Sequence, residues 1–361
     1  MSLVTQKQIR GMAFTLAGWG YIFYFYPPSL LVLIPCTFLV IAYYKHIFSR
    51  NFILHKSLLF LIFVIIILLE KNFLLWQGRL DIMPLAFSAF FINTLRYFHV
   101  YSCHKYVSSE DSDIWTVLAY MWFPPLLFCG PLETFQEFRE YHINRRPPMW
   151  LSGFKLMLSS LLKGVMVFVV YKSMVAVELD YATSNLWHLL LRVGSMGFTV
   201  MLSLSAWFDL SRGWSHWMGY TFSKPNFHQL HRVKSVASFW THYNIALSRW
   251  LKRHLFYRAL TEFRYKDFAV AILIYFVVIA LLKNISTGFL LWGLLHGAAI
   301  LINFAYIYLK LKFNKLLILD THYFPNVLKT LITYCFVLST WSLWYPDWYR
   351  LYGEIFIRLQ F

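Results

Sequence analysis

The stretch STGFLLWGLLHGAAILINFAYIYL, residues 286–309, decides the fold. It contains no Asp, Glu, Lys or Arg, and it is long enough for an α-helix to cross the hydrocarbon core of a bilayer. His296 lies near its middle, where an ionisable side chain is costly and is by default a functional candidate. The structural alternative is a neutral imidazole that only hydrogen-bonds a neighbouring helix.

The residues around His296 favour a functional role. Gly293 and Gly297 are four positions apart, a spacing of small residues that lets another backbone approach closely. Trp292 and Asn303 share roughly one helical face with His296. The segment therefore has a polar, crowded stripe inside an otherwise apolar helix.

The composition excludes an ordinary water-soluble protein. Of 361 residues, 59% are hydrophobic, 20% are aromatic and only 14% are charged. Because several apolar runs reach bilayer length, we predict an all-α, polytopic integral membrane protein with about 9–11 transmembrane helices plus re-entrant or interfacial helices. The aromatic residues are typical of interfacial belts and of helix packing in lipid.

The net charge of +17 would suggest nucleic-acid binding in a soluble chain. Here the cations cluster between apolar runs, as the positive-inside rule expects, so we predict no nucleic-acid partner. The four cysteines show no metal-binding or disulfide spacing, and we predict neither a metal nor a tightly bound cofactor.

Apolar windows predict a single membrane-embedded domain over residues 1–361. The predicted spans are 12–26, 29–44, 57–74, 82–101, 156–177, 185–207, 267–283, 287–309 and 326–345. The first two are short, and Pro27 and Pro28 between them predict a tilted hairpin. Residues 114–130 are expected to be re-entrant or tilted, because prolines interrupt them and because a full crossing would put the basic stretch 139–155 outside.

Residues 224–266 carry nine Lys and Arg against one acidic residue, Glu262. Apolar residues from about 237 to 260 have helical spacing, which predicts a helix at the cytoplasmic interface. It would serve either as an anchor to anionic lipids or as a cationic funnel for a phosphate-bearing acyl donor. In the second case Arg249 and Lys252 are the expected phosphate contacts.

Four blocks together resemble the membrane-bound O-acyltransferases. They are FPPLLFCGPLETFQEF (123–138), WFDLSRGWSHWMGYTF (207–222), SFWTHYNIALSRWLKRHLFY (238–257) and LLWGLLHGAAI (290–300). They occur in family order and resemble most the bacterial branch that acetylates alginate or carries D-alanine to teichoic acid. Asn244 stands where that branch has its first motif histidine, and FYRALTEFRYKD (256–267) replaces the glycine-rich loop of the family.

Acyl transfer to an alcohol needs a base for the hydroxyl proton and a donor that stabilises the developing oxyanion. His296 suits the first role, because imidazole has an ordinary pKa of about 6.5, and Asn244 suits the second through its amide NH2. The resemblance implies the same catalytic pair. His242 competes with Asn244, since two helical residues that close together face different ways.

Further residues are expected to line the substrate path or to serve structure alone. The candidate binding residues are Trp240, Ser248, Arg249, Lys252, Trp292 and Asn303. Three structural roles are also predicted: an ion pair between Asp209 and Arg212, a turn at Gly130 and Pro131, and a helix cap at Glu133.

The predicted function is membrane O-acyl transfer in the bacterial cytoplasmic membrane. The donor would be an acyl-coenzyme A or acyl carrier protein thioester carrying a short acyl group, and the acceptor a hydroxyl of an extracytoplasmic polysaccharide or envelope polymer. D-Alanyl transfer, and transfer to a lipid or a protein, remain alternatives. Envelope proteins are expected as further partners. A secondary transporter is the rival of a different class, because a midplane histidine and broken helices also occur there.

Overall fold

The computed structural model describes a helical protein. It covers residues 3–25, 37, 96, 99, 114–127, 133–144, 146–175, 180, 184–221, 225, 227–253, 265–283, 286–312 and 325–360. Over these residues the one β-contact is an isolated antiparallel bridge between Phe227 and Tyr243. Within the described ranges, three helical stretches are long and apolar enough to cross a bilayer: Trp150–Val175, Leu186–Trp217 and Thr287–Lys312. The predicted all-α, polytopic membrane class is confirmed.

Helix positions agree with the apolar windows at the C-terminal end and less well at the N-terminal end. The last three predicted spans correspond to α13 (Tyr265–Lys283), α14 (Thr287–Lys312) and α15 (Asn326–Ser342). Helix α8 (Trp150–Val170) starts earlier than predicted and runs into the π-helical turn η3 (Tyr171–Val175), and α9 (Leu186–Trp217) extends well beyond its window. The first helix, α1 (Leu3–Phe25), begins before the predicted residue 12. The predictions for 29–44, 57–74 and 82–101 lie outside the described residues, apart from single positions.

The chain forms two compact units. The first contains residues 1–159 and 207–224, and the second contains residues 160–206 and 225–361. The boundary after residue 159 falls within α8 and the boundary after residue 206 falls within α9, so both helices contribute residues to both units.

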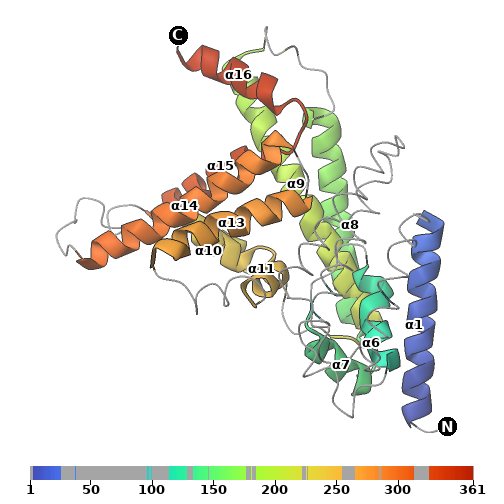
Figure 1. The fold of residues 1–361 in the computed structure, drawn as a ribbon. Coiled ribbons are helices and arrows are strands. Elements are labelled where there is room, and N and C mark those ends of the chain that lie inside the picture. The colour runs from blue at the N-terminus through green and yellow to red at the C-terminus, as the bar shows by residue number, and fades with distance from the viewer. Residues whose placement is uncertain are drawn as a thin grey trace. The chain divides into compact units, whose positions relative to one another are not determined.

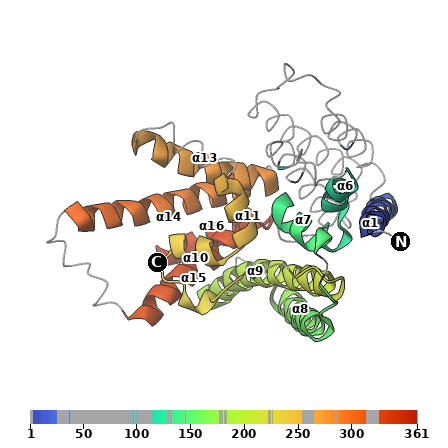
Figure 2. The same cartoon turned by 90° about the horizontal axis from the view of Figure 1, so that it is seen from below.

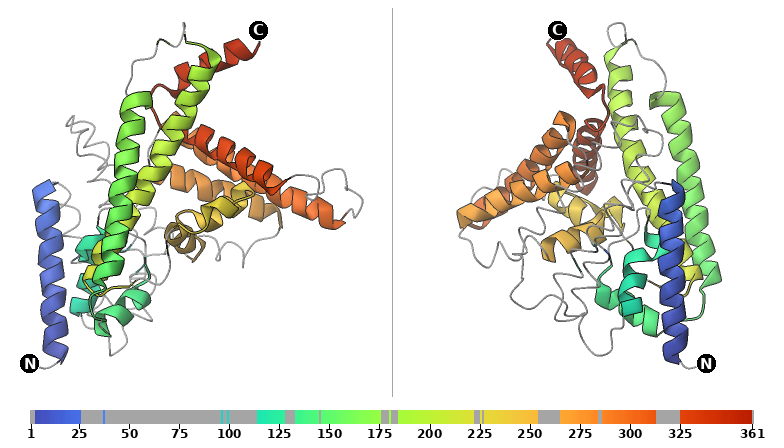
Figure 3. Two further views of the ribbon diagram at one scale, coloured as in Figure 1. Left: turned by 180° about the vertical axis from the view of Figure 1, so that it is seen from behind. Right: turned by 45° about the vertical axis from the view of Figure 1, so that its right-hand side comes forward.

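In the first unit, α1 packs along α6 (Ile114–Trp122), as Figure 3 shows. Helix α6 ends at Trp122, and Pro124 and Pro125 continue as the 3-10 turn η2 (Pro124–Leu126). A proline lacks the backbone N–H that would extend an α-helix, so the predicted break in this segment is confirmed. The predicted turn at Gly130 and Pro131 lies outside the described residues.

The predicted cap at Glu133 is wrong. Helix α7 (Phe135–Ile143) begins at Thr134, whose hydroxyl accepts from the backbone N–H of Glu137, while the Glu137 carboxylate accepts from the N–H of Thr134. This reciprocal pair is a capping box. Glu133 is instead buried, and its charge attracts the guanidinium groups of Arg96 and Arg212. Asp209 also attracts Arg212 electrostatically, and the ion pair between them stays a prediction.

In the second unit, α13 and α14 lie side by side, and α10 (Val236–His242) and α15 pack against α14 (Figures 1 and 2). The single helix predicted over 237–260 is wrong. Helix α10 ends at His242 and α11 (Ile245–Leu251) starts after Asn244, whose φ of 49° is left-handed. A left-handed residue cannot continue a right-handed helix, and asparagine tolerates this conformation better than most residues. Both short helices contribute buried side chains, among them Phe239 and Trp240 of α10 and Ala246 and Leu247 of α11, and their place at the cytoplasmic interface stays a prediction.

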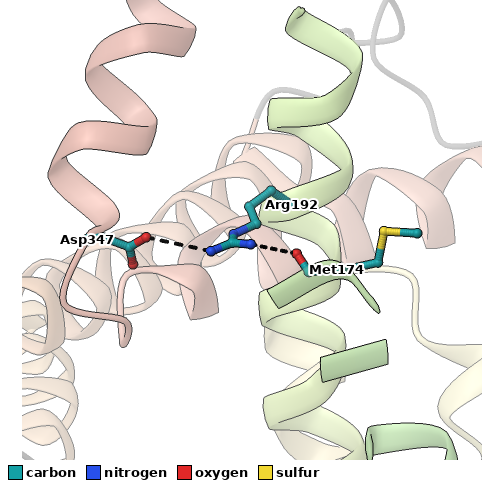
Figure 4. A network of polar contacts seen from close by, with 3 residues as sticks. All are labelled: Met174, Arg192 and Asp347. Carbon is teal, nitrogen blue, oxygen red and sulfur yellow. Dashed lines mark hydrogen bonds and ion pairs between the residues drawn. The ribbon is translucent and has the colours of Figure 1, made fainter. Parts of the chain in front are cut away.

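The C-terminal helix α16 (Trp348–Leu359) is tied to the end of η3 through α9. Arg192 on α9 donates to the carbonyl oxygen of Met174 at 2.8 Å and pairs with the carboxylate of Asp347 at 3.9 Å (Figure 4). Leu351 and Ile355 on α16 pack with Leu189 and other apolar residues of α9. The guanidinium therefore satisfies a carbonyl of the π-helical turn while holding the start of α16.

Candidate active site around His296

His296 is fully buried in the face of α14 that points into the second unit. Helix α14 is apolar nearly all round, so its hydrophobic pattern does not determine which face packs against other helices. Two glycines determine that face, because Gly293 and Gly297 both lie against α13, close to Phe276 and Leu273 respectively. The predicted close approach at these two small residues is confirmed, and it brings His296 to the inside of the helix pair.

Both ring nitrogens of His296 are hydrogen-bonded to other helices. The indole Nε1–H of Trp240 on α10 donates to Nδ1 at 3.1 Å. On the other side, Nε2 lies 2.9 Å from the hydroxyl oxygen of Thr340 on α15. The same Thr340 hydroxyl lies 3.0 Å from the carbonyl oxygens of Phe336 and Val337. The imidazole thus links α10, α14 and α15.

Aromatic rings enclose the imidazole. Phe276 lies nearly parallel to it, with an interplanar angle of 16° and ring centroids 6.1 Å apart. The rings of Trp240, Trp292 and Phe336 have their centroids at 5.0 to 5.4 Å. An apolar enclosure of this kind excludes water and strengthens the polar contacts within it. Trp292 was predicted as a binding residue, and the structure places it directly against the histidine.

Asn244 lies at the junction of the two short helices. It is buried, and its backbone carbonyl accepts from Ser248 as the N-cap residue of α11. Its side chain makes no capping bond, although asparagine side chains commonly cap helices. The amide is therefore not used to start the helix. Its assignment as oxyanion donor stays a prediction.

Ser248 supports Trp240. Its buried hydroxyl donates to the backbone carbonyl of Trp240 at 3.3 Å, and it is also hydrogen-bonded to the side chain of Tyr275 on α13. These bonds connect α11 and α13 to the residue that contacts His296. A substrate contact by Ser248 stays a prediction.

None of the contacts that the structure gives His296 involves Asn303, Arg249, Lys252 or His242. Asn303 is half-buried, seven residues further along α14, which is about 10 Å along the helix axis. Arg249 is half-buried and Lys252 is exposed. His242 hydrogen-bonds the carbonyl oxygen of Ser238 in its own helix at 2.8 Å. Nδ1 of His242 is therefore bonded within α10, while Trp240 of the same helix bonds His296.

Thr340 is the site residue that sequence reasoning missed. A threonine in an apolar helix usually bonds a carbonyl of its own previous turn, and Thr340 does so as well. Nothing local therefore distinguishes it from Thr333, which bonds the carbonyl of Lys329 on the same helix. Over the ranges that the structure describes, no group of three His, Cys, Asp or Glu side chains could hold a metal ion.

The motifs and this geometry agree with a comparison against known families. A sequence model of the membrane-bound O-acyltransferase (MBOAT) family matches residues 40–310. The chain belongs to this family. The match to the MBOAT family includes Trp240, Asn244 and His296, whereas Thr340 lies beyond its end.

Similar proteins include O-acetyltransferases of two bacterial polymers. The chain is 30% identical over 118 residues to a peptidoglycan O-acetyltransferase of Helicobacter pylori, covering 32% of this chain and 21% of that protein. It is 24% identical over 297 residues to "Probable alginate O-acetylase AlgI" of Pseudomonas putida, covering 76% and 56% respectively. The same-named protein of Pseudomonas syringae is 23% identical over 291 residues, covering 76% and 52%. The chain thus spans slightly more than half the length of these two alginate relatives and about a fifth of the peptidoglycan enzyme.

Proposed function

We propose that this MBOAT protein is an O-acyltransferase that moves a short acyl group, in the first place acetyl, onto a hydroxyl of an extracytoplasmic polysaccharide or envelope polymer. The donor would be a cytoplasmic thioester, either acyl-coenzyme A or an acyl carrier protein. The named relatives act on alginate and peptidoglycan, which supports a polymeric acceptor. The proposed location is the bacterial cytoplasmic membrane.

The observation that carries this proposal is the buried, doubly hydrogen-bonded His296 within a membrane-length helix. A neutral imidazole in an apolar enclosure is a base that can take the proton of an acceptor hydroxyl as the oxygen attacks the acyl carbon. Asn244 would donate its amide hydrogen to the oxyanion that forms on the acyl carbonyl. In this division of roles, the protein supplies one base, one oxyanion donor and a site from which water is excluded.

Two substitutions by amide residues distinguish a catalytic role of His296 from a structural one. In His296→Asn the side-chain oxygen can take the place of Nδ1 and keep the bond from Trp240. In His296→Gln the amide can reach the position of Nε2 and keep the bond with Thr340. Each variant keeps one of the two contacts, and neither can accept a proton at neutral pH. We expect both to insert and fold, with acyl transfer lowered by about a hundredfold to ten-thousandfold.

The assay uses purified protein in liposomes, with radiolabelled acetyl-coenzyme A on one side and peptidoglycan or alginate fragments on the other. Label that becomes covalently bound to the glycan, and is lost in both amide variants, supports the proposal. Near wild-type transfer by either variant would make His296 a structural residue. Uptake of glycan or acetate without covalent transfer would instead favour the secondary transporter.

A further inference from the structure

The hydrogen bond from Trp240 fixes the protonation state of one nitrogen of His296. An indole Nε1–H can only donate, so the Nδ1 atom at 3.1 Å must accept and carries no hydrogen. The buried neutral imidazole then carries its single hydrogen on Nε2. The Nδ1–H tautomer would instead place two N–H donors against each other in an enclosure of aromatic rings.

Thr340 completes the same orientation on the opposite side of the ring. Because Nε2 carries the hydrogen, it donates to the Thr340 hydroxyl oxygen at 2.9 Å. The hydroxyl donates its own hydrogen to the carbonyl oxygen of Phe336 or Val337, each 3.0 Å away. The donors thus run in one direction, from Trp240 through His296 and Thr340 to the backbone of α15.

We infer that Trp240 and Thr340 are positioning residues: they hold His296 as the Nε2–H tautomer, which makes Nδ1 the proton-accepting atom, and the indole N–H covers this atom until an acceptor hydroxyl replaces it. The inference about the tautomer stands on the contacts alone. The inference about the covered base rests on the proposed function, since it assigns a step in acyl transfer.

The step can be written with its atoms balanced. The acceptor hydroxyl displaces the indole N–H and donates to Nδ1, and its oxygen forms a bond to the carbonyl carbon of the thioester. Its proton passes to Nδ1, and the resulting imidazolium keeps the Nε2–H bond to Thr340. When the tetrahedral intermediate collapses, the C–S bond breaks and the thiolate takes a proton from Nδ1, so that ester and thiol leave. His296 returns to its starting tautomer.

The hydrogen bond from the indole N–H to Nδ1 of His296 has a chemical advantage when no acceptor is bound. Water that enters the site finds Nδ1 occupied by the indole N–H and is not activated against the thioester. A polymer makes further contacts with the protein, so its hydroxyl can displace the indole N–H from Nδ1. A single water molecule makes no such further contacts. Removing only the indole N–H should therefore increase hydrolysis of the donor.

The first test reads the tautomer without any activity. Full-length protein labelled with ¹³C and ¹⁵N in histidine is reconstituted in liposomes, and the spectrum of His296→Gln is subtracted from that of the wild type in solid-state NMR. The difference isolates the ring of His296. An Nε2–H signal is expected, and an Nδ1–H signal would overturn the inference. In Thr340→Val we expect the Nε2–H signal to shift or split, while Thr333→Val, which removes a hydroxyl bonded only to its own helix, leaves it unchanged.

The second test measures release of acetate from radiolabelled acetyl-coenzyme A in the absence of acceptor. Trp240→Phe should raise hydrolysis at least about threefold relative to transfer, because water gains access to Nδ1. Trp341→Phe removes another buried indole of the same unit and serves as the control for lost volume. A Trp240→Phe protein that transfers acetate but hydrolyses the donor no faster than Trp341→Phe would overturn the covering role.

Thr340 is tested by kinetics and by rescue. Thr340→Val should lower kcat at least about tenfold with little change in the KM of the donor, because it disturbs the base and not binding. Thr340→Ser keeps the hydroxyl and should restore most of the rate. Equal losses in Thr340→Val and Thr333→Val would show a structural role and overturn the assignment. If the wild type transfers no acyl group but shows the Nε2–H signal, the proposed function fails while the tautomer stands.

Discussion

Gly293 on α14 lies directly against the backbone of α13, since a β-carbon at this position would be 2.7 Å from the carbonyl oxygen of Phe276. The Phe276 ring stacks on His296, so the same close approach positions one wall of the candidate site. The two helices can therefore approach this closely only because glycine has no side chain.

Gly293→Ala should destabilise the protein by about 1–3 kcal/mol, because the added methyl group meets a backbone atom that cannot move away easily. Unfolding in detergent micelles measures this change. Gly194→Ala on α9 is the matched control, since a β-carbon there meets no atom within 4 Å. Equal stability of the two variants would show that α13 and α14 pack less closely than the structure has them.

Asn244 allows the backbone and the side chain to be tested separately. Glycine adopts the left-handed conformation at no steric cost, so Asn244→Gly keeps the junction between α10 and α11 and removes only the amide. If the amide stabilises an oxyanion, Asn244→Gly and Asn244→Asp should both lose about a hundredfold to a thousandfold in kcat while remaining folded. Full activity in the glycine variant would reduce Asn244 to a backbone role.

The predicted donor contact at Arg249 and Lys252 is tested through KM. Replacing both cations by glutamine should raise the KM for acetyl-coenzyme A several-fold and should weaken its dependence on salt, because the contact is to phosphate. Lys234→Gln removes an exposed cation that precedes α10 and is the control. If all three substitutions raise KM alike, the basic segment acts through its general charge, as expected of an anchor to anionic lipid.

The hydroxyls of two half-buried tyrosines, Tyr345 and Tyr352, predict that the protein loses stability at alkaline pH. Burial raises the pKa of Tyr345 and of Tyr352, whose hydroxyls bond Thr199 at 2.7 Å and the carbonyl oxygen of Ser339 at 2.6 Å respectively. Their stabilising contribution is fully present below a pH of about 10, the ordinary tyrosine value, and is lost as the pH rises through the higher pKa of the folded state.

Thermal unfolding at pH 8 and at pH 11 measures this contribution. The double variant Tyr345→Phe, Tyr352→Phe should be less stable than wild type at pH 8 but should lose less stability on going to pH 11. Tyr349→Phe removes an exposed hydroxyl from α16 and should behave like wild type at both values. An identical loss of stability in the double variant and the wild type would contradict the prediction.

The sequence was sufficient for the helical class, for the boundaries of α13 to α15 to within three residues and for the place of His296. Apolar length and a lone ionisable residue are strong signals in a membrane protein. It also indicated Trp240, but as a substrate contact. The hydrogen bond to His296 depends on how α10 meets α14, and no spacing along the chain encodes that contact.

For two of the wrong predictions, the cap at Glu133 and the single helix over 237–260, the sequence itself indicates the observed structure. The sequence T-F-Q-E at 134–137 has the form of a capping box, which assigns the helix start to Thr134 and not to Glu133. Asn244 is a residue type that tolerates left-handed geometry, which is a reason to expect a helix break there. Thr340 had no such signal, because its role arises only when α15 packs beside α14.

The hydrogen-bonded residues Trp240, His296 and Thr340 are separated by 56 and 44 positions along the chain. During synthesis, α10 and α14 are therefore made before α15. For that interval Nε2 of His296 lacks the hydroxyl that receives its hydrogen. The arrival of α15 gives the imidazole its last partner, so a chain interrupted before residue 340 keeps an incompletely bonded polar group in a membrane-length helix, where an unsatisfied group is costly.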